Sequence, residues 1–438
     1  MAPDLTLQQR VRALAPRYYT AVSRLLRPTE RGIARGVQAV ESLAYRARSV
    51  QTPLLRASTP PRIVLDCSAF QDPGGISRLW SAVMAEWSTS GFAQHVLVLD
   101  RKGTTPRFGG FTYREMPIVR AQDSSAQRLM LEAVCRAERA DLFVSTVYTH
   151  PERCPFLVYV YDMTPEVLGW NLREPLWREK RRAIRHAATL VCLSQSTKRD
   201  LHRLHPETST HPSPVILPGV EASFAPAATD AVVALRERLS LPESYVLFLG
   251  HRDGYKNAQL LFDAIARAED ASFGLLLVGG APTLEPHLAR KAGNVPVRIA
   301  PLSDADLRAA YTGAAALLYL SRYEGFGLPI LEAMACGCPV ITCQNSSLPE
   351  AAGSAALYVG EDDPGALLEA IRNVGSADVR ADLIERGHAW ASSFSWARTA
   401  SELEGAIMRA AAGDDAGLAA AIEQLEPGIA ERGRPECG

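Results

Sequence analysis

Short apolar runs alternate with segments of helical periodicity over most of the chain, and they fall into two series. Apolar strands that alternate with helices are typical of parallel sheets covered by helices on both faces. The pattern therefore predicts an α/β fold with two doubly wound domains facing each other across a cleft. The predicted strands of the first series are Ile63–Cys67, His95–Leu99, Leu142–Ser145, Phe156–Tyr161 and Thr189–Leu193, and those of the second are Tyr245–Leu249, Gly274–Val278, Val297–Ile299, Ala316–Leu320 and Val340–Thr342.

The segment between the two series marks a domain boundary. It contains the sequence HPSPVILPGVEASFAPAATD, with Pro218-Gly219 near its centre, and this composition favours a connection over a helix or strand. Ligands of doubly wound sheets bind beyond the carboxyl ends of the strands, so functional residues are expected there. The predicted units are 62–220 for the first domain, 221–390 for the second, 391–412 for a C-terminal helix that crosses back to the first domain, and 413–438 for a tail.

Residues 1–61 differ from the rest of the chain in charge and periodicity. They contain ten arginines and no lysine. Apolar residues recur at helical spacing from Leu7 to Leu25 and again from Ile33 to Val50, with Pro16 bending or splitting the first stretch. Two helices are expected. They either dock on the main body or on a partner subunit, or they lie as a basic amphipathic arm on an anionic membrane surface.

The overall composition narrows the class of protein. With 47% hydrophobic and 22% charged residues, the chain is typical of a soluble globular protein, and a net charge of −1 gives no field that would recruit nucleic acid. No apolar run approaches the ~18 residues that a membrane span needs, and the first ten residues lack a hydrophobic signal core. The eight cysteines show neither a CxxC pair nor the spacing of a zinc site. We therefore expect a cytoplasmic protein with reduced thiols.

Two polar segments follow predicted strands of the first series. In DPGGISR, the pair Gly74-Gly75 would let a ligand approach the backbone closely, although such pairs also form simple turns. The segment lacks the GxGxxG pattern of a dinucleotide site. In YVYDMTPEVLG, Asp162 either accepts a hydrogen bond from a hydroxyl in the cleft or caps a turn.

Two cations follow the first predicted strand of the second series. In GHRDGYKN, Arg252 and Lys256 are expected to project from a tight turn before the next helix. Two cations beside helix amides form an anion site suited to a diphosphate. The alternative is a solvated basic turn, which needs no particular spacing of arginine and lysine.

Two carboxylates flank a glycine-rich loop in SRYEGFGLPILEAMACGCPVI. Pro329 suits a first helical position and Gly337 a C′ position, which predicts a short helix from about 329 to 336. Its N-terminus and the amides of Gly325–Leu328 would face the cleft and stabilise negative charge on a phosphate or a departing oxygen. We expect Glu324 in the loop and Glu332 in the first turn to accept hydrogen bonds from the hydroxyls of a sugar and a ribose. Stabilisation of the helix N-terminus is the alternative role of Glu332.

These motifs closely resemble those of the GT-B-fold retaining glycosyltransferases of family 4. EGFGLPILEAMACGCPVI matches the E-x7-E signature of that family, and GHRDGYKN resembles its phosphate-binding turn. DPGGISR resembles the glycine loop of the N-terminal domain, and YDMTPEVLG the segment that faces the acceptor. The resemblance runs from about residue 62 to 410. It implies a GT-B fold of two Rossmann-like domains, with 62–220 on the acceptor side and 221–390 binding a nucleotide sugar.

The resemblance also implies roles for individual residues. It places Arg252 and Lys256 on the donor diphosphate, Glu332 on the ribose hydroxyls and Glu324 beside the transferred sugar. It implies no catalytic metal and no cofactor, and a front-face attack in which the leaving phosphate takes the acceptor proton. The residues of the predicted site are Asp162, Arg252, Lys256 and Glu324 for catalysis, and Gly75, Arg252, Lys256, Glu324, Gly325, Phe326, Gly327, Leu328 and Glu332 for donor binding.

The chain departs from the family pattern at one position. Many relatives carry histidine before the position of Asp162, where this chain has Tyr161. His150, in TVYTH, is the candidate to replace that histidine, although a single histidine after a strand is also compatible with a structural role.

The resemblance implies a hexosyltransferase that moves a mannose- or glucose-type sugar to a glycan or lipid-linked glycan acceptor in surface polysaccharide biosynthesis. GDP-mannose, UDP-glucose and related donors all match it. The expected location is the cytoplasm, with the inner face of the cytoplasmic membrane as an open alternative. A sugar phosphorylase shares the architecture but would need a lysine-bound pyridoxal phosphate and a longer chain. A catalytically inactive scaffold subunit of a polysaccharide-assembly complex is the alternative from another class. The chain keeps the cations Arg252 and Lys256 and both glutamates of the E-x7-E segment, and this disfavours the inactive scaffold.

Overall fold

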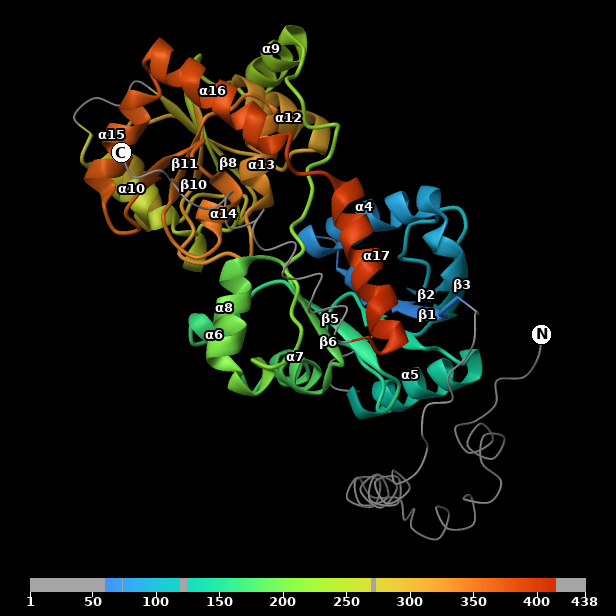
Figure 1. The fold of residues 1–438 in the computed structure, drawn as a ribbon. Coiled ribbons are helices and arrows are strands. Elements are labelled where there is room, and N and C mark those ends of the chain that lie inside the picture. Colours follow the sequence, from blue (N-terminus) through green and yellow to red (C-terminus); the bar gives the residue numbers. More distant parts are fainter. Residues whose placement is uncertain (1–59, 73, 119–123, 269–272, 415–438) are drawn as a thin grey trace. The chain divides into compact units, whose positions relative to one another are not determined.

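The computed structural model describes residues 60–72, 74–118, 124–268 and 273–414 (Figure 1). The helices predicted for the arm, up to residue 59, and the tail from residue 415 lie outside the described residues.

Two six-stranded parallel sheets form the framework of the described chain. The strand order is β3-β2-β1-β4-β5-β6 in the first sheet and β12-β11-β10-β7-β8-β9 in the second. Counted from its own first strand, each sheet has the order of a doubly wound nucleotide-binding fold, which confirms the predicted architecture. The strands are β1 (Ile63–Asp66), β2 (Val96–Arg101), β3 (Thr112–Met116), β4 (Leu142–Ser145), β5 (Phe156–Val160) and β6 (Thr189–Cys192), then β7 (Tyr245–Leu249), β8 (Gly274–Val278), β9 (Val297–Ile299), β10 (Ala316–Tyr319), β11 (Val340–Cys343) and β12 (Leu357–Val359).

The apolar pattern missed the two edge strands β3 and β12. In β3, which has the sequence TYREM, only Met116 is buried. β12 is three residues long, with only Val359 buried. A strand at a sheet edge has one neighbour and tolerates polar side chains, so it leaves a weak hydrophobic signal.

Helices connect the strands and cover the sheets (Figure 1). The first half contains α4 (Gly75–Ser90), α5 (Ser124–Glu138), α6 (Thr164–Val167), α7 (Pro175–His186) and α8 (Gln195–Leu204), and the short 3-10 turns η1 (Ser68–Gln71), η2 (Phe92–His95) and η4 (Pro206–Thr208). The second half contains α9 (Thr229–Arg238), η5 (Gly254–Lys256), α10 (Ala258–Ala266), α11 (Pro286–Ala292), α12 (Asp304–Gly313), α13 (Leu328–Ala335), α14 (Leu348–Ala352), α15 (Pro364–Asn373), α16 (Ala377–Ala391) and α17 (Trp396–Ala412).

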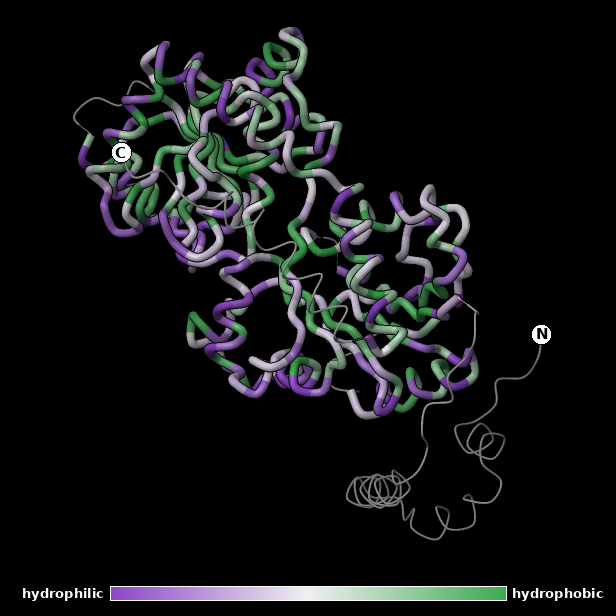
Figure 2. The backbone as a smooth tube through the Cα atoms, in the orientation of Figure 1, coloured by the Kyte–Doolittle hydropathy of each residue, from purple (hydrophilic) through white to green (hydrophobic). Residues whose placement is uncertain are grey.

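Alternate residues of the strands point into apolar layers on opposite faces of the first sheet. Ile63 and Leu65 of β1 belong to one buried cluster, with α4 and α17, whereas Val64 belongs to another. This is the two-residue period of a strand buried on both faces. The inner strands of both sheets are correspondingly hydrophobic along the backbone trace (Figure 2).

The last helix, α17, belongs to the core of the first half although it follows the second half in sequence. The indole Nε1 of Trp87 in α4 donates a hydrogen bond to Ala400 O at 3.1 Å, and Thr399 Oγ1 donates to Leu217 O at 2.8 Å. Gly219 lies against the backbone just before α17, and a Cβ there would be 2.3 Å from the amide nitrogen of Trp396. The two chain segments that join the halves therefore pack against each other, and glycine is required where they cross.

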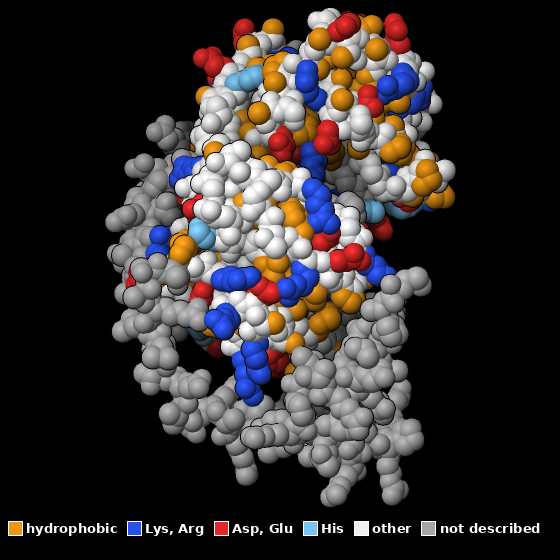
Figure 3. Space-filling model, turned by 90° about the vertical axis from the view of Figure 1, so that its right-hand side faces the viewer, with side chains coloured by type: hydrophobic (Ala, Val, Ile, Leu, Met, Phe, Trp, Pro, Cys, Tyr) orange, Lys and Arg blue, Asp and Glu red, His pale blue; other side chains and the backbone are white. Residues whose placement is uncertain are grey.

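The described residues on the face shown in Figure 3 carry mixed charge. Basic and acidic side chains are interspersed over the face shown in Figure 3, which has no extended surface of a single charge. Among the described residues, no helix combines the length and apolarity needed to cross a bilayer. The seven described cysteines are free thiols.

Candidate active site

The second sheet reverses its winding direction between β7 and β10. These strands are neighbours, with Val246 opposite Ala316, and the connections that follow them lead away to opposite sides of the sheet. Such a reversal opens a crevice at the carboxyl ends of the two strands, where ligands of doubly wound folds bind. Lys256 follows β7 and Glu324 follows β10, so the topology delivers both predicted residues to this point.

Lys256 and Glu324 form an ion pair there. The distance from Lys256 Nζ to Glu324 Oε1 is 2.6 Å, and Ser321 Oγ donates to the same oxygen at 2.6 Å. Lys256 Nζ also donates to the hydroxyl of Tyr319 at 3.2 Å. Burial by itself would lower the pKa of Lys256, but the neighbouring Tyr319, Glu324 and Tyr255 raise it above its ordinary value. Lys256 is therefore held as a cation at the strand ends.

The turn after β7 is shaped to place the lysine stem. Gly250 has φ +117°, a conformation that favours glycine, and a Cβ added there would be 3.2 Å from Lys256 Cγ. The aliphatic part of the Lys256 side chain thus packs against the backbone of Gly250, where there is no side chain in the way. A second glycine, Gly254 with φ +76°, opens the η5 turn that carries Lys256.

Two serine hydroxyls of the second half hold the loop between Glu324 and α13, and the first, Ser346 Oγ, accepts a hydrogen bond from the amide of Glu324 at 3.1 Å. Ser347 Oγ donates to Glu324 O at 2.8 Å and to Phe326 O at 3.0 Å, while the Phe326 side chain is buried in the core. Gly327, with φ +121°, precedes the first residue of α13, Leu328. The loop that precedes α13 is therefore fixed to the segment that carries Ser347.

The predicted short helix is confirmed with a shift of one residue. α13 spans Leu328–Ala335, with Pro329 in its first turn and Gly337 just beyond its end at φ +73°. Glu332 is the fifth residue of α13, so the prediction that it lies in the first turn was wrong. It lies a full turn inside the helix, where stabilisation of the N-terminus does not account for it.

Glu332 is buried and faces an arginine of the first half. Its Oε2 accepts a hydrogen bond from the hydroxyl of Tyr311 at 3.2 Å, and its Oε1 lies 3.6 Å from Arg78 Nη2. Arg78 comes from α4, pairs also with Asp304 at 3.3 Å, and lies over the ring of Phe224. Burial raises the pKa of Glu332, while Arg78 and the Tyr311 hydrogen bond lower it.

Sequence reasoning missed Arg78 as part of this site. It stands in the quoted segment DPGGISR, three residues after Gly75. A single arginine in the first turn of a helix has no diagnostic spacing, and its partner Glu332 is 254 residues away. The glycine pair before α4 is the feature of this segment that sequence reasoning predicted to contact a ligand.

Arg252 is buried rather than projecting from the turn as predicted. Its Nη1 donates to Gly279 O at 2.9 Å, its Nη2 donates to Thr283 O at 2.9 Å, and its Nε bonds to Glu285 at 2.9 Å. The chain after β8 exposes carbonyl groups that need donors, and the guanidinium supplies them. Arg252 could contact a diphosphate only if its guanidinium gave up some of these hydrogen bonds.

In the first half, Asp162 has the turn-capping role considered for it, and part of its side chain stays accessible. Its Oδ1 accepts a hydrogen bond from the amide of Thr164 at 2.8 Å, which caps a turn, and a third of its side chain is exposed. Gly325 of the second-half loop lies against the same segment, because a Cβ on Gly325 would be 2.0 Å from Tyr161 O and 3.0 Å from Asp162 Cβ. Asp162 and the Glu324 loop are therefore neighbours.

The two side chains considered in place of the family histidine are core residues. Tyr161 stacks on Tyr159, accepts a hydrogen bond from the indole of Trp80 at 2.6 Å and donates one to Thr146 O at 2.7 Å. His150 is buried against the ring of Phe156, with its Nδ1 2.8 Å from a backbone carbonyl, and burial lowers its pKa to about 4. Neither side chain is placed to orient an acceptor.

The space around the glycine loop of the first half is open. Gly75 begins α4, and a Cβ placed on it would meet no atom within 4 Å. Neither packing nor backbone conformation requires glycine there, so a requirement for a bare backbone would come from a ligand.

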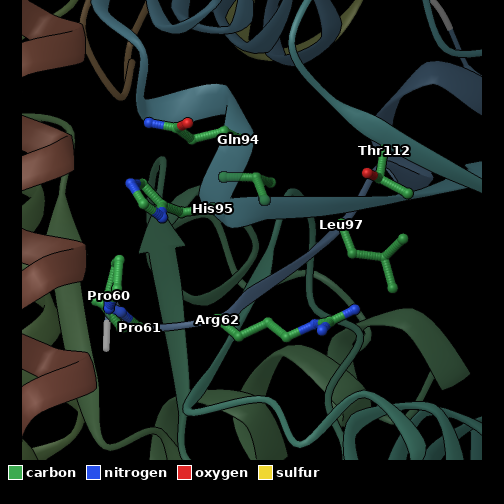
Figure 4. Close-up of a pocket in the computed structure, with 8 residues that line it drawn as sticks. Pro60, Pro61, Arg62, Gln94, His95, Leu97 and Thr112 are labelled. Atoms are coloured by element: carbon green, nitrogen blue, oxygen red, sulfur yellow. The ribbon is translucent and has the colours of Figure 1, made fainter. Parts of the chain in front are cut away.

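A separate pocket of about 260 Å³ lies near the beginnings of strands β1 and β2 in the first sheet (Figure 4). Arg62 and His95, which line it, precede β1 and β2 in sequence. It therefore opens at the amino ends of the strands, away from the predicted chemistry. In the part of the chain that the structure describes, no group of three or more His, Cys, Asp or Glu side chains is arranged to hold a metal ion.

Comparisons with known proteins relate parts of the chain to glycosyltransferases. Residues 243–376 match the family model described as glycosyl transferases group 1. A 94-residue segment is 43% identical to the O-antigen chain mannosyltransferase B of Escherichia coli, over 21% of this chain and 25% of that protein. A 237-residue segment is 30% identical to the D-inositol 3-phosphate glycosyltransferase of Corynebacterium glutamicum (strain R), over 50% of this chain and 56% of that protein. The chain thus spans a quarter of the first relative and about half of the second.

Solved structures of other proteins share the fold. HepE of Anabaena, in complex with UDP and glucose, is 17% identical with a TM-score of 0.61, over 78% of this chain and 98% of its own. WaaG, a glycosyltransferase involved in lipopolysaccharide biosynthesis, is 17% identical with a TM-score of 0.64, over 79% of this chain and 99% of its own. The two doubly wound sheets of this chain are therefore those of the GT-B fold.

Proposed function

We propose that the protein is a retaining glycosyltransferase that moves a hexose from a nucleotide-diphosphate sugar to a glycan or lipid-linked glycan in surface polysaccharide biosynthesis. The observation that supports it best is the Lys256–Glu324 pair at the point where the second sheet reverses its winding, 2.6 Å apart and directly before the amides that open α13. The group 1 match over residues 243–376 covers the same elements.

In the proposed donor site, the loop amides, the lysine and the two glutamates each bind a different part of the donor. The diphosphate lies against the amides of Gly325–Leu328, and Lys256 offsets the charge that develops on the leaving phosphate. Glu324 then exchanges part of its contact with Lys256 for a hydroxyl of the transferred sugar, and Glu332 accepts hydrogen bonds from the ribose. Since Lys256 supplies the positive charge, transfer is proposed to need no divalent metal. Arg252 is assigned a structural role, because its hydrogen bonds hold the loop after β8 in place.

The proposed reaction is a front-face substitution at the anomeric carbon. The bond from this carbon to the phosphate oxygen breaks, and its electron pair leaves with the nucleoside diphosphate. The acceptor hydroxyl oxygen forms the new bond on the same face and gives its proton to the departing phosphate. Asp162 orients that hydroxyl. Retention rests on the resemblance of the E-x7-E segment, and Lys256 is the group that this chain places where the leaving charge develops.

GDP-mannose and UDP-glucose are the donors proposed for the first tests. The relatives include a protein named as an O-antigen chain mannosyltransferase, and a protein with the same fold was solved with UDP and glucose. We propose a cytoplasmic location at the inner membrane face, with residues 1–61 and their ten arginines as the contact to anionic lipid or a partner subunit.

A ligand screen followed by a turnover assay tests the proposal. Thermal unfolding with UDP, GDP, ADP and their sugars, in the presence of EDTA, should identify one nucleotide class, since a ligand at 100 times its Kd adds roughly 2.7 kcal/mol of stability. Slow hydrolysis of the matching donor should follow, with the anomer of the released sugar read by NMR. An inactive scaffold subunit would bind without hydrolysis or would not bind, and release of the inverted anomer would overturn retention.

A further inference from the structure

An exposed aromatic surface leads from the first half to the proposed donor site. Trp170 is 42% exposed. Its ring centroid lies 5.7 Å from that of Trp177 and 6.4 Å from that of Tyr255. Tyr255 belongs to the η5 turn and directly precedes Lys256. The aromatic surface therefore ends beside the Lys256–Glu324 pair.

A buried carboxylate with one unpartnered oxygen belongs to the same segment of the chain. Glu166 lies in α6, four residues before Trp170, and the turn between them is closed by the amide of Trp170 donating to Pro165 O at 2.8 Å. The Glu166 side chain is 5% exposed. Its Oε2 accepts a hydrogen bond from Lys180 at 2.8 Å, whereas Oε1 has no hydrogen-bond partner among the described residues. A buried oxygen of this kind is stabilised by a hydroxyl donor.

The charges in this region favour a neutral ligand. Lys180 is fully buried, and its Nζ is committed to Glu166 Oε2 and, at 2.9 Å, to Asp162 O. Its charge is thus balanced within the protein. Beside the rings of Trp170 and Trp177, a ligand would meet the partly exposed carboxylate of Asp162 and the unpartnered oxygen of Glu166. A phosphate would meet two carboxylates, whereas hydroxyl groups would donate to them.

We propose that Trp170, Trp177 and Glu166 form a subsite for a neutral hexopyranose ring at the acceptor end of a glycan. The C–H face of a pyranose packs on the exposed indole of Trp170, which removes apolar surface of both from water. A ring hydroxyl donates to Glu166 Oε1. The neighbouring hydroxyl is then directed along Tyr255 toward Lys256. The inference rests on the proposed function and specifies its acceptor as a sugar ring rather than an inositol phosphate.

Direct binding measurements test the subsite without turnover. Methyl α-D-mannopyranoside, methyl α-D-glucopyranoside and inositol 3-phosphate are the probes, titrated into the full chain by NMR. We expect a methyl hexopyranoside to bind and inositol 3-phosphate to bind more weakly. Trp170→Ala should weaken the hexopyranoside by roughly 10-fold, and Trp170→Phe should recover part of the loss. Leu129→Ala, which removes a comparably exposed apolar side chain from α5 (47% exposed), should bind as wild type.

Several outcomes separate this inference from the proposed function. Wild-type hexopyranoside affinity in Trp170→Ala, tighter binding of inositol 3-phosphate, or no binding of either hexopyranoside would each overturn the subsite. Nucleotide binding and donor hydrolysis, measured on the same variants, should remain at wild-type values. Their absence in the wild-type protein would instead overturn the transferase proposal. Glu166 is left unchanged because its removal would leave Lys180 buried without a counter-charge.

Discussion

The guanidinium of Arg78 lies 3.6 Å from the carboxylate of Glu332, and this contact links α4 of the first half to α13 of the second. Arg78 is 39% exposed at its side chain and Glu332 is 9% exposed. The partly solvated cation thus moderates the charge of a nearly buried acid. Burial raises the pKa of Glu332, and Arg78 works in the opposite direction.

Replacement of Arg78 by methionine should shift the pH dependence of donor binding. Arg78→Met removes the charge and keeps a long side chain over Phe224, so the pKa of Glu332 should rise further. A protonated Glu332 accepts weaker hydrogen bonds from ribose hydroxyls, and donor affinity should fall as the pH drops through that pKa. We expect the midpoint of this fall at a higher pH in the variant than in wild type. Calorimetric titration of UDP or GDP across the acidic range checks this, and identical midpoints would contradict it.

Glu332→Gln should separate stability from donor binding. The folded-state pKa of Glu332 is raised above its ordinary value, so the native state loses stability as the pH rises above the unfolded-state pKa and the buried group ionises. A neutral glutamine keeps the volume and can still accept from Tyr311. We expect equal or higher thermal stability of the free protein at pH 7, with donor binding weakened by roughly 10-fold. A loss of stability comparable to that of Glu332→Ala would show that Glu332 supports the fold.

Removal of the Lys256 charge should slow the chemical step. Lys256→Ala should lower the rate of transfer by roughly 10²-fold or more, because a fixed charge partner at the leaving phosphate is lost. Lys256→Arg, which retains a cation with a different reach, should recover part of the rate. The wild-type enzyme should keep its activity in excess EDTA. Activity that disappears in EDTA and returns with Mg²⁺ or Mn²⁺ would refute the metal-free mechanism, and wild-type kinetics in Lys256→Ala would remove the phosphate site.

The sequence was informative where function and local structure depend on the same residues. The α13 helix was predictable because Pro329 and Gly337 mark its two ends, and the strands because both of their faces are apolar. Lys256 and Glu324 were each predicted to follow a strand, and the structure places them after β7 and β10; their contact was not predicted. Local pattern therefore predicted the sheet architecture and the positions of these two residues after their strands.

The remaining parts depend on contacts between distant segments. Arg252 has the same local setting as Lys256, yet the carbonyl groups after β8 engage its guanidinium. Arg78 and Glu332 meet only once both halves are folded. Trp170 carries no motif, and its place beside Tyr255 depends on the contact of the first-half segment with the η5 turn. No local spacing encodes such pairs.

Gly325 should be intolerant of even one methyl group. A Cβ there would lie 2.0 Å from Tyr161 O, so Gly325→Ala must displace the loop that carries Glu324 from the end of β5. We expect a loss of roughly 1–3 kcal/mol in the free energy of unfolding, together with reduced turnover. Gly109→Ala is the matched control, because a Cβ at Gly109 meets nothing within 4 Å. Equal unfolding midpoints for the two variants would show that the loop and β5 do not contact each other as described.

Asp162→Asn should isolate the chemical role of the Asp162 carboxylate. The side chain serves two purposes, since its Oδ1 caps the turn at Thr164 and its exposed part is proposed to orient the acceptor hydroxyl. Asparagine keeps the cap, because its carbonyl oxygen can accept the same amide hydrogen bond, but it loses the charge. Turnover should therefore fall while donor affinity and unfolding temperature stay near wild type. Asp162→Ala removes both functions and should lower stability as well. Stopped assays at saturating donor, with donor Kd and unfolding measured on both variants, distinguish the two roles. A comparable loss of donor binding in Asp162→Asn would assign Asp162 to the donor site or to the fold.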